Sequence, residues 1–472
     1  MLIQTIHHQG FFTPDQEKTY VHLPFEMPVG AVRLEVEYQY SDRISSEPGL
    51  EGGNTLDLGV FDERGIDFLT AGFRGWSGSE RPMFFITEKE AALGYLAGAL
   101  NPGKWHVLLG LYKIAPQGCT YEATIRVTTR ENYKRNVRSG SAESLAASRG
   151  TLPASQPPAH FSPWLGGELH CHTWHSDGQL SAEKLVRLSV ERGLDFLAVA
   201  DHNTIASQRE LEKFHNPGLI LIRGVEVTTF KGHFNVWGVP DWVDFRVTQP
   251  MEMQSALEFA RQRGALVSCN HPKPYGPEWD FPAVTNFHCV EVWNGPWVLF
   301  NQVALDYWLS LLQTGMRIPA VTGSDFHRLD EMTQVISRAP GSPINWVYVP
   351  GKPDAANILQ AVSAGHVSLS DAPEGPFLDL RGGKGSEWMA GDHLPPPADG
   401  KLSVQVRCLR GAGCSLSILD QKKVLFEKQI ADNDELLSAD LPTEGSLYVR
   451  AELRLDQDQL RAMTNPVYLR LR

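Results

Sequence analysis

The chain has 472 residues, 42% of them hydrophobic, which is enough for two or three domains with cores of their own. Its formal net charge is −12, and no Lys/Arg-rich run gives it a nucleic-acid footprint, although a small phosphorylated substrate is not excluded. The start of the chain does not read as a secretory signal, and no window of about 18 apolar residues predicts a membrane span. Six scattered cysteines without a CxxC pair favour reduced thiols, so we expect a cytoplasmic protein.

The first 135 residues have the alternating pattern of an all-β domain. Val32–Tyr40 alternates polar and apolar side chains, and further short segments of this kind follow at hairpin-like spacing. These segments are Thr55–Phe61, Pro82–Ile86, Trp105–Tyr112 and Tyr121–Thr129. We expect an N-terminal β-sandwich over residues 1–135. Residues 136–163 are rich in Ser, Pro and Ala and are predicted to be a linker.

From residue 164 the pattern changes to short apolar runs that alternate with helical segments. The predicted helices are Ala182–Arg192, Met251–Arg263 and Gln302–Gln313. The apolar runs are Phe196–Ala200, Leu219–Ile222, Ala265–Ser268, Cys289–Trp293 and Ile318–Thr322. This alternation predicts an α/β domain over residues 164–372, with a parallel sheet that has both faces covered and enough strands for a barrel. Residues 373–472 return to β alternation and predict a small C-terminal β-sandwich.

Potential metal ligands stand in short motifs near the ends of the apolar runs. The motifs are His170-Cys171-His172, Ser176-Asp177-Gly178, Asp201-His202-Asn203, Glu226, His233, Asn270-His271-Pro272 and Ser324-Asp325-Phe326-His327. In a parallel α/β barrel, chemistry collects where strands end and loops begin, so we expect these side chains to converge. Each motif alone has an ordinary structural explanation, but five of them at successive strand ends indicate a site. Imidazole and carboxylate without thiolate suit zinc, manganese or iron in a catalytic site.

Three of these segments together resemble a known family. Glu168–Gly178, Ala200–Asn203 and Gly323–His327 are similar to the polymerase and histidinol phosphatase (PHP) family, and more narrowly to its carbaryl-hydrolase-like branch, the CehA/McbA type. The resemblance covers about residues 165–372. It implies a distorted (β/α)7 barrel with two or three divalent metal ions (Mn, Zn or Fe) at its C-terminal mouth.

The resemblance also implies which residues hold each ion. By motif, His170, His172, Glu226 and Asp325 would hold the first metal, and Asp177, His202 and His327 the second. Glu226 would bridge to a third metal, completed by His233 and His271. The leading hypothesis is a metal-dependent phosphoesterase, acting on a monoester or diester through a metal-bridged hydroxide, with Asp325 taking the proton of the attacking water.

Further residues near these motifs are candidates for contact with a small-molecule phosphoester or ester. His175 is either a leaving-group acid or a loop histidine without a role. Lys273, Tyr275, Arg328 and Asn294 are predicted substrate contacts, each with a structural alternative as a turn, salt-bridge or core residue. A cationic pocket would favour phosphate, whereas an aromatic wall would favour the alternative, a carboxylic ester or carbamate hydrolase on an aryl substrate. A non-catalytic, metal-stabilised binding protein is a remote third hypothesis, and the sequence leaves the oligomeric state open.

Overall fold

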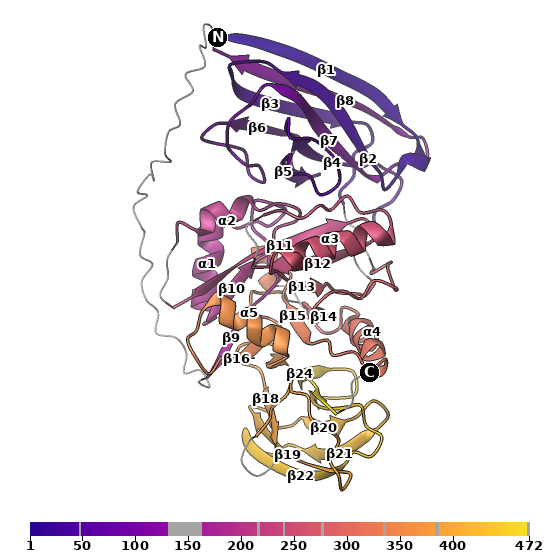
Figure 1. Ribbon diagram of the computed structural model, residues 1–472, viewed down its shortest axis with the longest axis vertical. Coiled ribbons are helices and arrows are strands. Elements are labelled where there is room, and N and C mark those ends of the chain that lie inside the picture. The colour runs from indigo at the N-terminus through magenta and orange to yellow at the C-terminus, as the bar shows by residue number, and fades with distance from the viewer. Residues whose placement is uncertain are drawn as a thin grey trace.

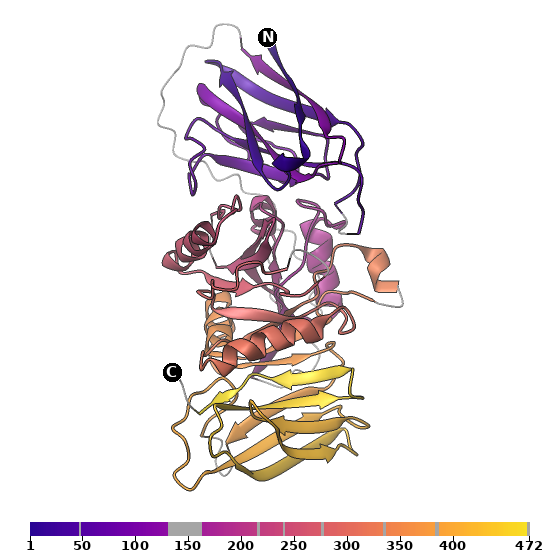
Figure 2. The ribbon, with the colours of Figure 1, turned by 90° about the vertical axis from the view of Figure 1, so that its right-hand side faces the viewer.

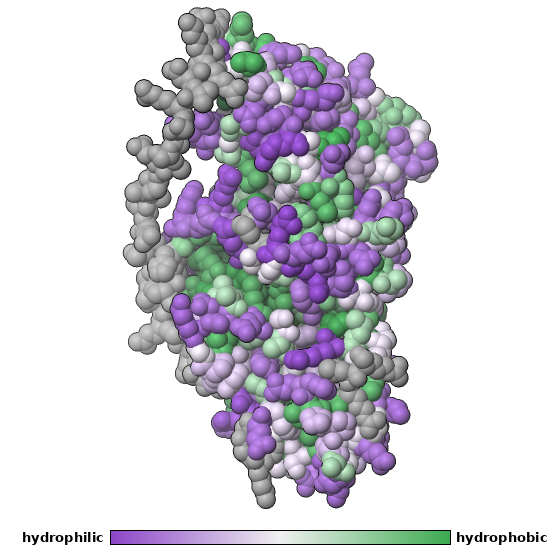
Figure 3. Space-filling model, viewed as in Figure 1, coloured by the Kyte–Doolittle hydropathy of each residue, from purple (hydrophilic) through white to green (hydrophobic). Residues whose placement is uncertain are grey.

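The protein consists of three parts stacked along its long axis: an N-terminal β part, a central α/β part and a C-terminal β part (Figure 1). The computed structural model describes residues 1–46, 49–130, 163–214, 218–238, 241–274, 278–333, 337–382 and 387–469. Hydrophilic side chains spread over the visible face of all three parts, with hydrophobic patches between them (Figure 3). Within the described ranges, no helix is long and apolar enough to cross a membrane.

The N-terminal part is built from two four-stranded antiparallel sheets, ordered β1-β8-β3-β6 and β2-β7-β4-β5. The strands are β1 (Leu2–Phe12), β2 (Tyr20–Met27), β3 (Ala31–Tyr40), β4 (Thr55–Phe61), β5 (Phe73–Gly78), β6 (Met83–Thr87), β7 (Gly103–Lys113) and β8 (Cys119–Thr129), with a short 3-10 helix at Pro14–Gln16. Because successive side chains of a strand point to opposite faces, every second residue is buried between the sheets, as with Leu34 and Val36 of β3 and Leu58 and Val60 of β4.

The central part carries nine strands in the order β15-β14-β13-β12-β11-β10-β9-β16-β17. They are β9 (Trp164–Glu168), β10 (Phe196–Val199), β11 (Ile220–Thr229), β12 (Gly232–Trp237), β13 (Leu266–Cys269), β14 (Cys289–Asn294), β15 (Ala320–Gly323), β16 (Ile344–Tyr348) and β17 (Val367–Ser370). β9, β10 and β11 run parallel, as do β13, β14 and β15, whereas β12 is antiparallel to both of its neighbours. The carboxyl ends of the parallel strands therefore lie at one edge of the sheet.

Five α-helices and a 3-10 helix connect these strands. They are α1 (Ala182–Glu191), α2 (Ala206–Leu211), α3 (Pro250–Gln262), α4 (Asn301–Gln313), α5 (Ala355–Ala364) and η2 (Leu329–Thr333). The helices α1, α3 and α4 lie within one residue of the predicted bounds. The Ser181 side chain caps α1 by accepting from Lys184 N, and Pro250 opens α3, both favourable positions for these residue types.

The predicted (β/α)7 barrel is corrected by the structure, in which the described residues form no closed sheet. β16 runs antiparallel to β9 and uses its other edge for β17, so no strand is left to form a ladder with β15. The Asn345 side chain of β16 joins this gap instead, donating to Thr322 O at 2.8 Å and accepting from Thr322 N at 2.9 Å. The loop after β15 also reaches the loop after β9, where Asp325 N donates to His170 O at 2.8 Å. The sheet thus curls until its first and last motif-bearing loops meet.

The C-terminal part continues the central sheet. β24 pairs with β17, and the long sheet then runs on through β23, β20 and β21, while β18, β19 and β22 form a separate three-stranded sheet. These strands are β18 (Phe377–Gly382), β19 (Lys401–Leu409), β20 (Ser415–Leu419), β21 (Val424–Gln429), β22 (Asp434–Pro442), β23 (Tyr448–Arg454), β24 (Leu460–Thr464) and β25 (Val467–Tyr468). A shared sheet, and not a flexible connection, therefore holds the C-terminal part to the central one.

The N-terminal sandwich packs on the central part through aromatic side chains. Phe73 stacks on Trp242 with 4.2 Å between ring centroids. The ring centroids of Trp76 and Phe245 are 4.5 Å apart. Figure 1 shows β4 and β5 on the side of the sandwich that faces the central part, and Figure 2 shows the same arrangement from the side. Aromatic pairs of this kind bury large apolar area and fix the relative position of the two parts.

Candidate metal centre

The structure brings the predicted metal ligands together at one edge of the central sheet. His170 and His172 follow β9, His202 follows β10, His271 follows β13, and Asp325 and His327 follow β15. The end of the apolar run Leu219–Ile222 did not mark the end of a strand: β11 extends to Thr229, so Glu226 lies inside it and faces the same edge. His233 lies on β12, directly across from Thr228 of β11.

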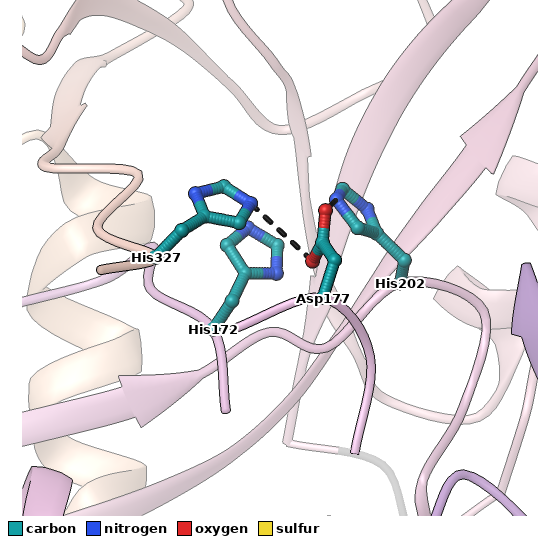
Figure 4. Close-up of side chains that lie close together, drawn as sticks. All are labelled: His172, Asp177, His202 and His327. Carbon is teal, nitrogen blue, oxygen red and sulfur yellow. Dashed lines mark ion pairs between the residues drawn. The ribbon is translucent and has the colours of Figure 1, made fainter. Parts of the chain in front are cut away.

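Three overlapping groups of side chains offer ligand atoms within 4.8 Å of one another. They are His172 with Asp177, His202 and His327; His170 with Glu226 and His271; and His170 with His172 and Asp325. Figure 4 shows the first group, with Asp177 between His202 and His327; Asp177 Oδ1 is 3.4 Å from His327 Nε2, and Oδ2 is 3.5 Å from His202 Nε2. His170 and His172 each belong to two groups, so the three groups are adjoining parts of one cluster.

Glu226 is the carboxylate at the middle of the cluster. Its Oε1 lies 3.2 Å from His271 Nε2 and 3.3 Å from His233 Nδ1. Its Oε2 lies 3.3 Å from His170 Nε2 and 2.8 Å from His202 Nδ1. The side chain is fully buried, and His233 reaches the cluster only through it. Glu226 is thus placed to contact more than one ion.

The donor set fits divalent metal ions. His170 Nε2, His172 Nδ1, Asp177 Oδ1, Glu226 Oε2 and His233 Nε2 are buried without a hydrogen-bond partner. Buried polar atoms are normally satisfied, because an unpaired one costs about 1–3 kcal/mol. Five such atoms in one cluster of imidazole and carboxylate groups would gain partners by binding metal ions.

Charge within the cluster already favours the ligating forms of several side chains. Burial, together with His327 and His202, lowers the pKa of His172 to about 4, so this imidazole is neutral at pH 7. Burial opposes the ionisation of Asp177, but His327 and His202 hold its pKa well below the usual value. Against the same cost of burial, His170 and His202 hold the pKa of Glu226 low. Metal binding requires neutral imidazole and ionised carboxylate, which these three residues provide.

Several residues that the sequence analysis missed hold the ligands in place. Glu291 Oε1 is 2.9 Å from His170 Nδ1, and Thr228 Oγ1 is 2.6 Å from His202 Nδ1. Such partners on the second ring nitrogen orient a ligating histidine. Arg338 Nη1 donates to Asp325 Oδ2 at 3.1 Å and so fixes the one carboxylate of the cluster that lies on the β15 loop. Only Glu291 carried a sequence signal, as a charged residue inside an apolar strand.

A buried carboxylate also holds the two ends of the curled sheet together. Glu168 at the end of β9 accepts from His170 N at 2.8 Å, Ser324 N at 3.1 Å and Gly341 N at 2.8 Å. The nearby backbone is strained, since Asp325 has a φ of 52°, a left-handed conformation that non-glycine residues rarely adopt. Strain of this kind persists where surrounding structure fixes it, as it does at functional sites.

The cluster forms the floor of a cavity of about 310 Å³. The wall of the cavity opposite this floor comes from the N-terminal sandwich and from the turn between β11 and β12. Its members are Tyr20, Ser46, Asp57, Trp76, Ser77, Gly78, Ser79, Glu80, Tyr112 and Phe230. The sequence analysis assigned none of these residues to the site, because no motif marks them and the fold alone places them there.

Two of the predicted substrate or catalytic residues, His175 and Lys273, are not among the residues that line the cavity. The His175 ring accepts from Gly94 N at 3.3 Å through Nδ1 and lies 2.9 Å from Glu210 Oε2 through Nε2, and it does not line the cavity. It joins the N-terminal part to α2 and has no free nitrogen for acid catalysis. Lys273 is also buried away from the cavity, with Nζ donating to Asn294 O at 2.9 Å. Burial lowers the pKa of Lys273 to about 7, and Arg338 adds to that effect.

The remaining predicted contacts have different outcomes. Asn294 does line the cavity, at the end of β14, and its side chain donates to Glu291 Oε2 at 3.3 Å. Arg328 is exposed and is not among the residues that line the cavity. Tyr275 lies outside the described residues.

Comparisons with known proteins give short sequence matches and weak structural ones. No family model matches the chain. The chain is 44% identical over 63 residues to the 5'-3' exoribonuclease of Haemophilus influenzae, and the match covers 13% of this chain and 23% of that protein. It is 45% identical over 107 residues to the 5'-3' exoribonuclease Rnm of Escherichia coli, covering 21% of this chain and 36% of that one. The chain thus spans only about a quarter to a little over a third of the length of these relatives.

Two solved structures match the chain at low identity and low TM-score. A two-domain protein from Bacteroides vulgatus, described as containing a predicted PHP-like metal-dependent phosphoesterase, is 15% identical, with a TM-score of 0.37 over 68% of this chain and 100% of that chain. An amidohydrolase from Chromobacterium violaceum is 14% identical, with a TM-score of 0.25 over 37% of this chain and 90% of that chain. At these TM-scores neither structure bears on the function.

Proposed function

We propose that the protein is a metal-dependent hydrolase and that it cleaves small phosphoesters. The observation that carries this proposal is the set of three ligand groups that overlap at His170 and His172 and contribute other members to the lining of one cavity. Divalent ions bound there would supply a water of lowered pKa and positive charge for the phosphoryl oxygens. The ligand set of imidazole and carboxylate, with no thiolate, suits that chemistry.

The chain's own residues would support the reaction in distinct ways. Glu226 would offset positive charge at the centre of the cluster, because its two oxygens face different histidines. Asp325 lines the cavity, and its carboxylate would accept the proton of the attacking water. Arg338 would keep that carboxylate oriented through its hydrogen bond to Oδ2. Asn294 would contact the substrate from the end of β14, between the strands that precede His271 and Asp325.

The sequence matches support phosphoester chemistry. The relatives that are 44% and 45% identical to this chain over short stretches are named as exoribonucleases, which cleave phosphodiester bonds. The matches give less support for an RNA substrate in this chain. The cavity here is at the small end of the range for small-molecule pockets, and no Lys or Arg is among the described residues that line it. We therefore propose a small phosphoester and not an RNA chain.

A carboxylic ester or carbamate of an aryl alcohol is the second candidate. Two observations favour it: the lack of Lys or Arg among the described lining residues, and the aromatic wall that includes Tyr20, Trp76 and Tyr112. A metal-activated water attacks an acyl carbon as well as a phosphorus atom, so the same floor serves both reactions. The two candidates differ in substrate and share the site.

A turnover screen tests the proposal. Protein reconstituted with manganese or zinc would be assayed on p-nitrophenyl phosphate, bis-p-nitrophenyl phosphate, naphthyl acetate and a naphthyl carbamate. We expect phosphoester hydrolysis that a chelator stops and that His202→Ala abolishes, while His7→Ala, an exposed histidine far from the cluster, keeps it. Turnover of the acetate or carbamate with none of the phosphoesters would replace the first candidate by the second. No turnover of any substrate would contradict the hydrolase proposal.

A further inference from the structure

The wall of the cavity that faces the metal cluster is acidic and aromatic. Asp57 of β4 and Glu80, just after β5, line it together with Tyr20, Trp76 and Tyr112. Neither carboxylate has a hydrogen bond or an ion pair to another described side chain. The carboxylates on the floor would be neutralised by bound metal ions, whereas Asp57 and Glu80 have no such partner.

This wall is held rigidly above the floor. Arg81, next to Glu80, donates to Ser176 O at 3.1 Å, and Thr204 Oγ1 donates to Gly94 O at 2.8 Å. Tyr20 OH donates to Phe245 O at 3.3 Å. Together with the aromatic contacts between the two parts, these bonds fix the distance from the acidic wall to the ligands. A substrate that reaches the metal cluster must therefore meet the acidic wall with its other end.

Within the described part of the chain, no cationic side chain forms an ion pair with either carboxylate, so a cation on the ligand could pair with them. The groups that face Asp57 are Lys18, Glu80 and His202, and none of them lies within ion-pair distance of it. Lys18 Nζ lies instead 3.7 Å from the centre of the Tyr112 ring. Burial raises the pKa of Asp57 to about 7 despite Lys18, and burial and Asp177 raise that of Glu80 despite Arg328 and Arg81. A positive group on the ligand would stabilise both carboxylates in their charged forms.

The aromatic side chains suit the same kind of group. Tyr20 stacks on Phe230 with 4.8 Å between ring centroids, and the Lys18 ammonium already lies over the rings of Tyr112 and Phe230, 3.7 and 5.4 Å from their centres. Ammonium groups bind over such rings because the ring faces are electron-rich. An aromatic surface next to unpaired carboxylates is a common arrangement for recognition of an amine.

We propose that Asp57 and Glu80, with the aromatic wall, select substrates whose non-reacting end carries an ammonium group, such as aminoalkyl or aminoaryl esters. This inference rests on the proposed hydrolase function for the reaction but not for the binding. The acidic wall repels polyanions, so it also separates this chain from enzymes that act on RNA. The reacting ester would lie at the cluster and the amine about one small molecule's length away, against the N-terminal sandwich.

A binding experiment tests this selection without turnover. The affinities of the metal-loaded protein for phenethylamine and phenethyl alcohol, which have nearly the same shape, would be measured by titration calorimetry. We expect the wild type to bind the amine tighter by about tenfold or more, as an ammonium group next to carboxylates and aromatic rings would. Asp57→Asn and Glu80→Gln should each reduce the ratio, and the double variant should bring it close to one. Glu37→Gln, an exposed carboxylate of the same sandwich, should leave it unchanged.

The outcomes separate this inference from the proposed function. Equal affinities in the wild type, no measurable binding of the amine at about 10 mM, or a preference that survives in the double variant would each overturn the inference. A parallel assay would compare p-nitrophenyl aminoethyl phosphate with p-nitrophenyl ethyl phosphate. If neither is hydrolysed but the amine still binds selectively, the phosphoesterase proposal fails and the amine site stands. If both are hydrolysed at equal kcat/KM, the phosphoesterase proposal stands and the amine site is overturned.

Discussion

Replacing Glu226 by Gln tests the centre of the proposed metal site. The substitution keeps the shape of a fully buried side chain but removes its charge. The two carboxylate oxygens face separate pairs of histidines, so the charge would be lost toward two ions at once. If each charge-assisted contact contributes about 1.5–3 kcal/mol, the combined loss is about 3–6 kcal/mol, or roughly 10²–10⁴ in metal affinity.

The assay is metal content after dialysis against a fixed concentration of free manganese or zinc, with circular dichroism to verify the fold. Glu226→Gln should lose more than one equivalent, whereas His233→Ala, which reaches the cluster only through Glu226, should lose at most one. Glu452→Gln is the matched control, because it neutralises a buried carboxylate in the C-terminal part. Full metal content in Glu226→Gln would refute the bridging role and leave a site of separate ions.

Three further variants test other parts of the structure. Lys273→Met should lower the free energy of unfolding by about 1–3 kcal/mol in chemical denaturation, because it removes the two buried hydrogen bonds that Nζ donates to Asn294 O and Asn301 Oδ1; lost phosphoester turnover at unchanged stability would instead restore its predicted role in substrate binding. Gly323→Ala should reduce metal content, since the new methyl group would lie 2.3 Å from Cβ of His170, whereas Gly351→Ala, with open space around it, should not; equal metal content in both would contradict this packing argument. Asp57→Asn should stabilise the metal-free protein, because the pKa of Asp57 is raised to about 7 in the folded state. The wild type therefore loses folding stability as the pH rises from about 4 to about 7, since over this range the unfolded chain has released the proton and the folded protein has not. The variant has no carboxyl group and no such loss. An advantage of the variant that does not grow over this pH window, measured by denaturation at several pH values, would show that burial of Asp57 carries no such cost.

The floor of the site was predictable because its signal is local. Asp201-His202 and Asp325-x-His327 follow short apolar strands, His170-x-His172 is a motif in its own right, and parallel strands bring their carboxyl ends together. Glu226 was found by its residue type, although the strand that carries it is longer than the apolar run suggested. The closed barrel was wrong because β16 and β17 turn antiparallel, and no apolar run distinguishes that direction from the parallel one.

The second wall of the cavity could not be predicted from the sequence. Asp57 lies in a strand whose alternation marks only the core of the sandwich, and nothing nearby indicates which face meets another domain. Lys273 and His175 were predicted as substrate or catalytic residues from their distance along the chain to a ligand. The structure shows that both side chains turn away and are held by buried hydrogen bonds. Proximity in sequence identifies the loop that carries a side chain but not the direction of the side chain.

The most direct test of the central claim is phosphoester hydrolysis measured as metal-free protein is titrated with manganese or zinc. We expect no turnover without metal and a rate that rises through more than one equivalent, because the three ligand groups offer more donor atoms than a single ion would use. A rate that is already at its maximum in metal-free protein, or one that is absent for every phosphoester and ester at saturating metal, would contradict a multinuclear hydrolytic site.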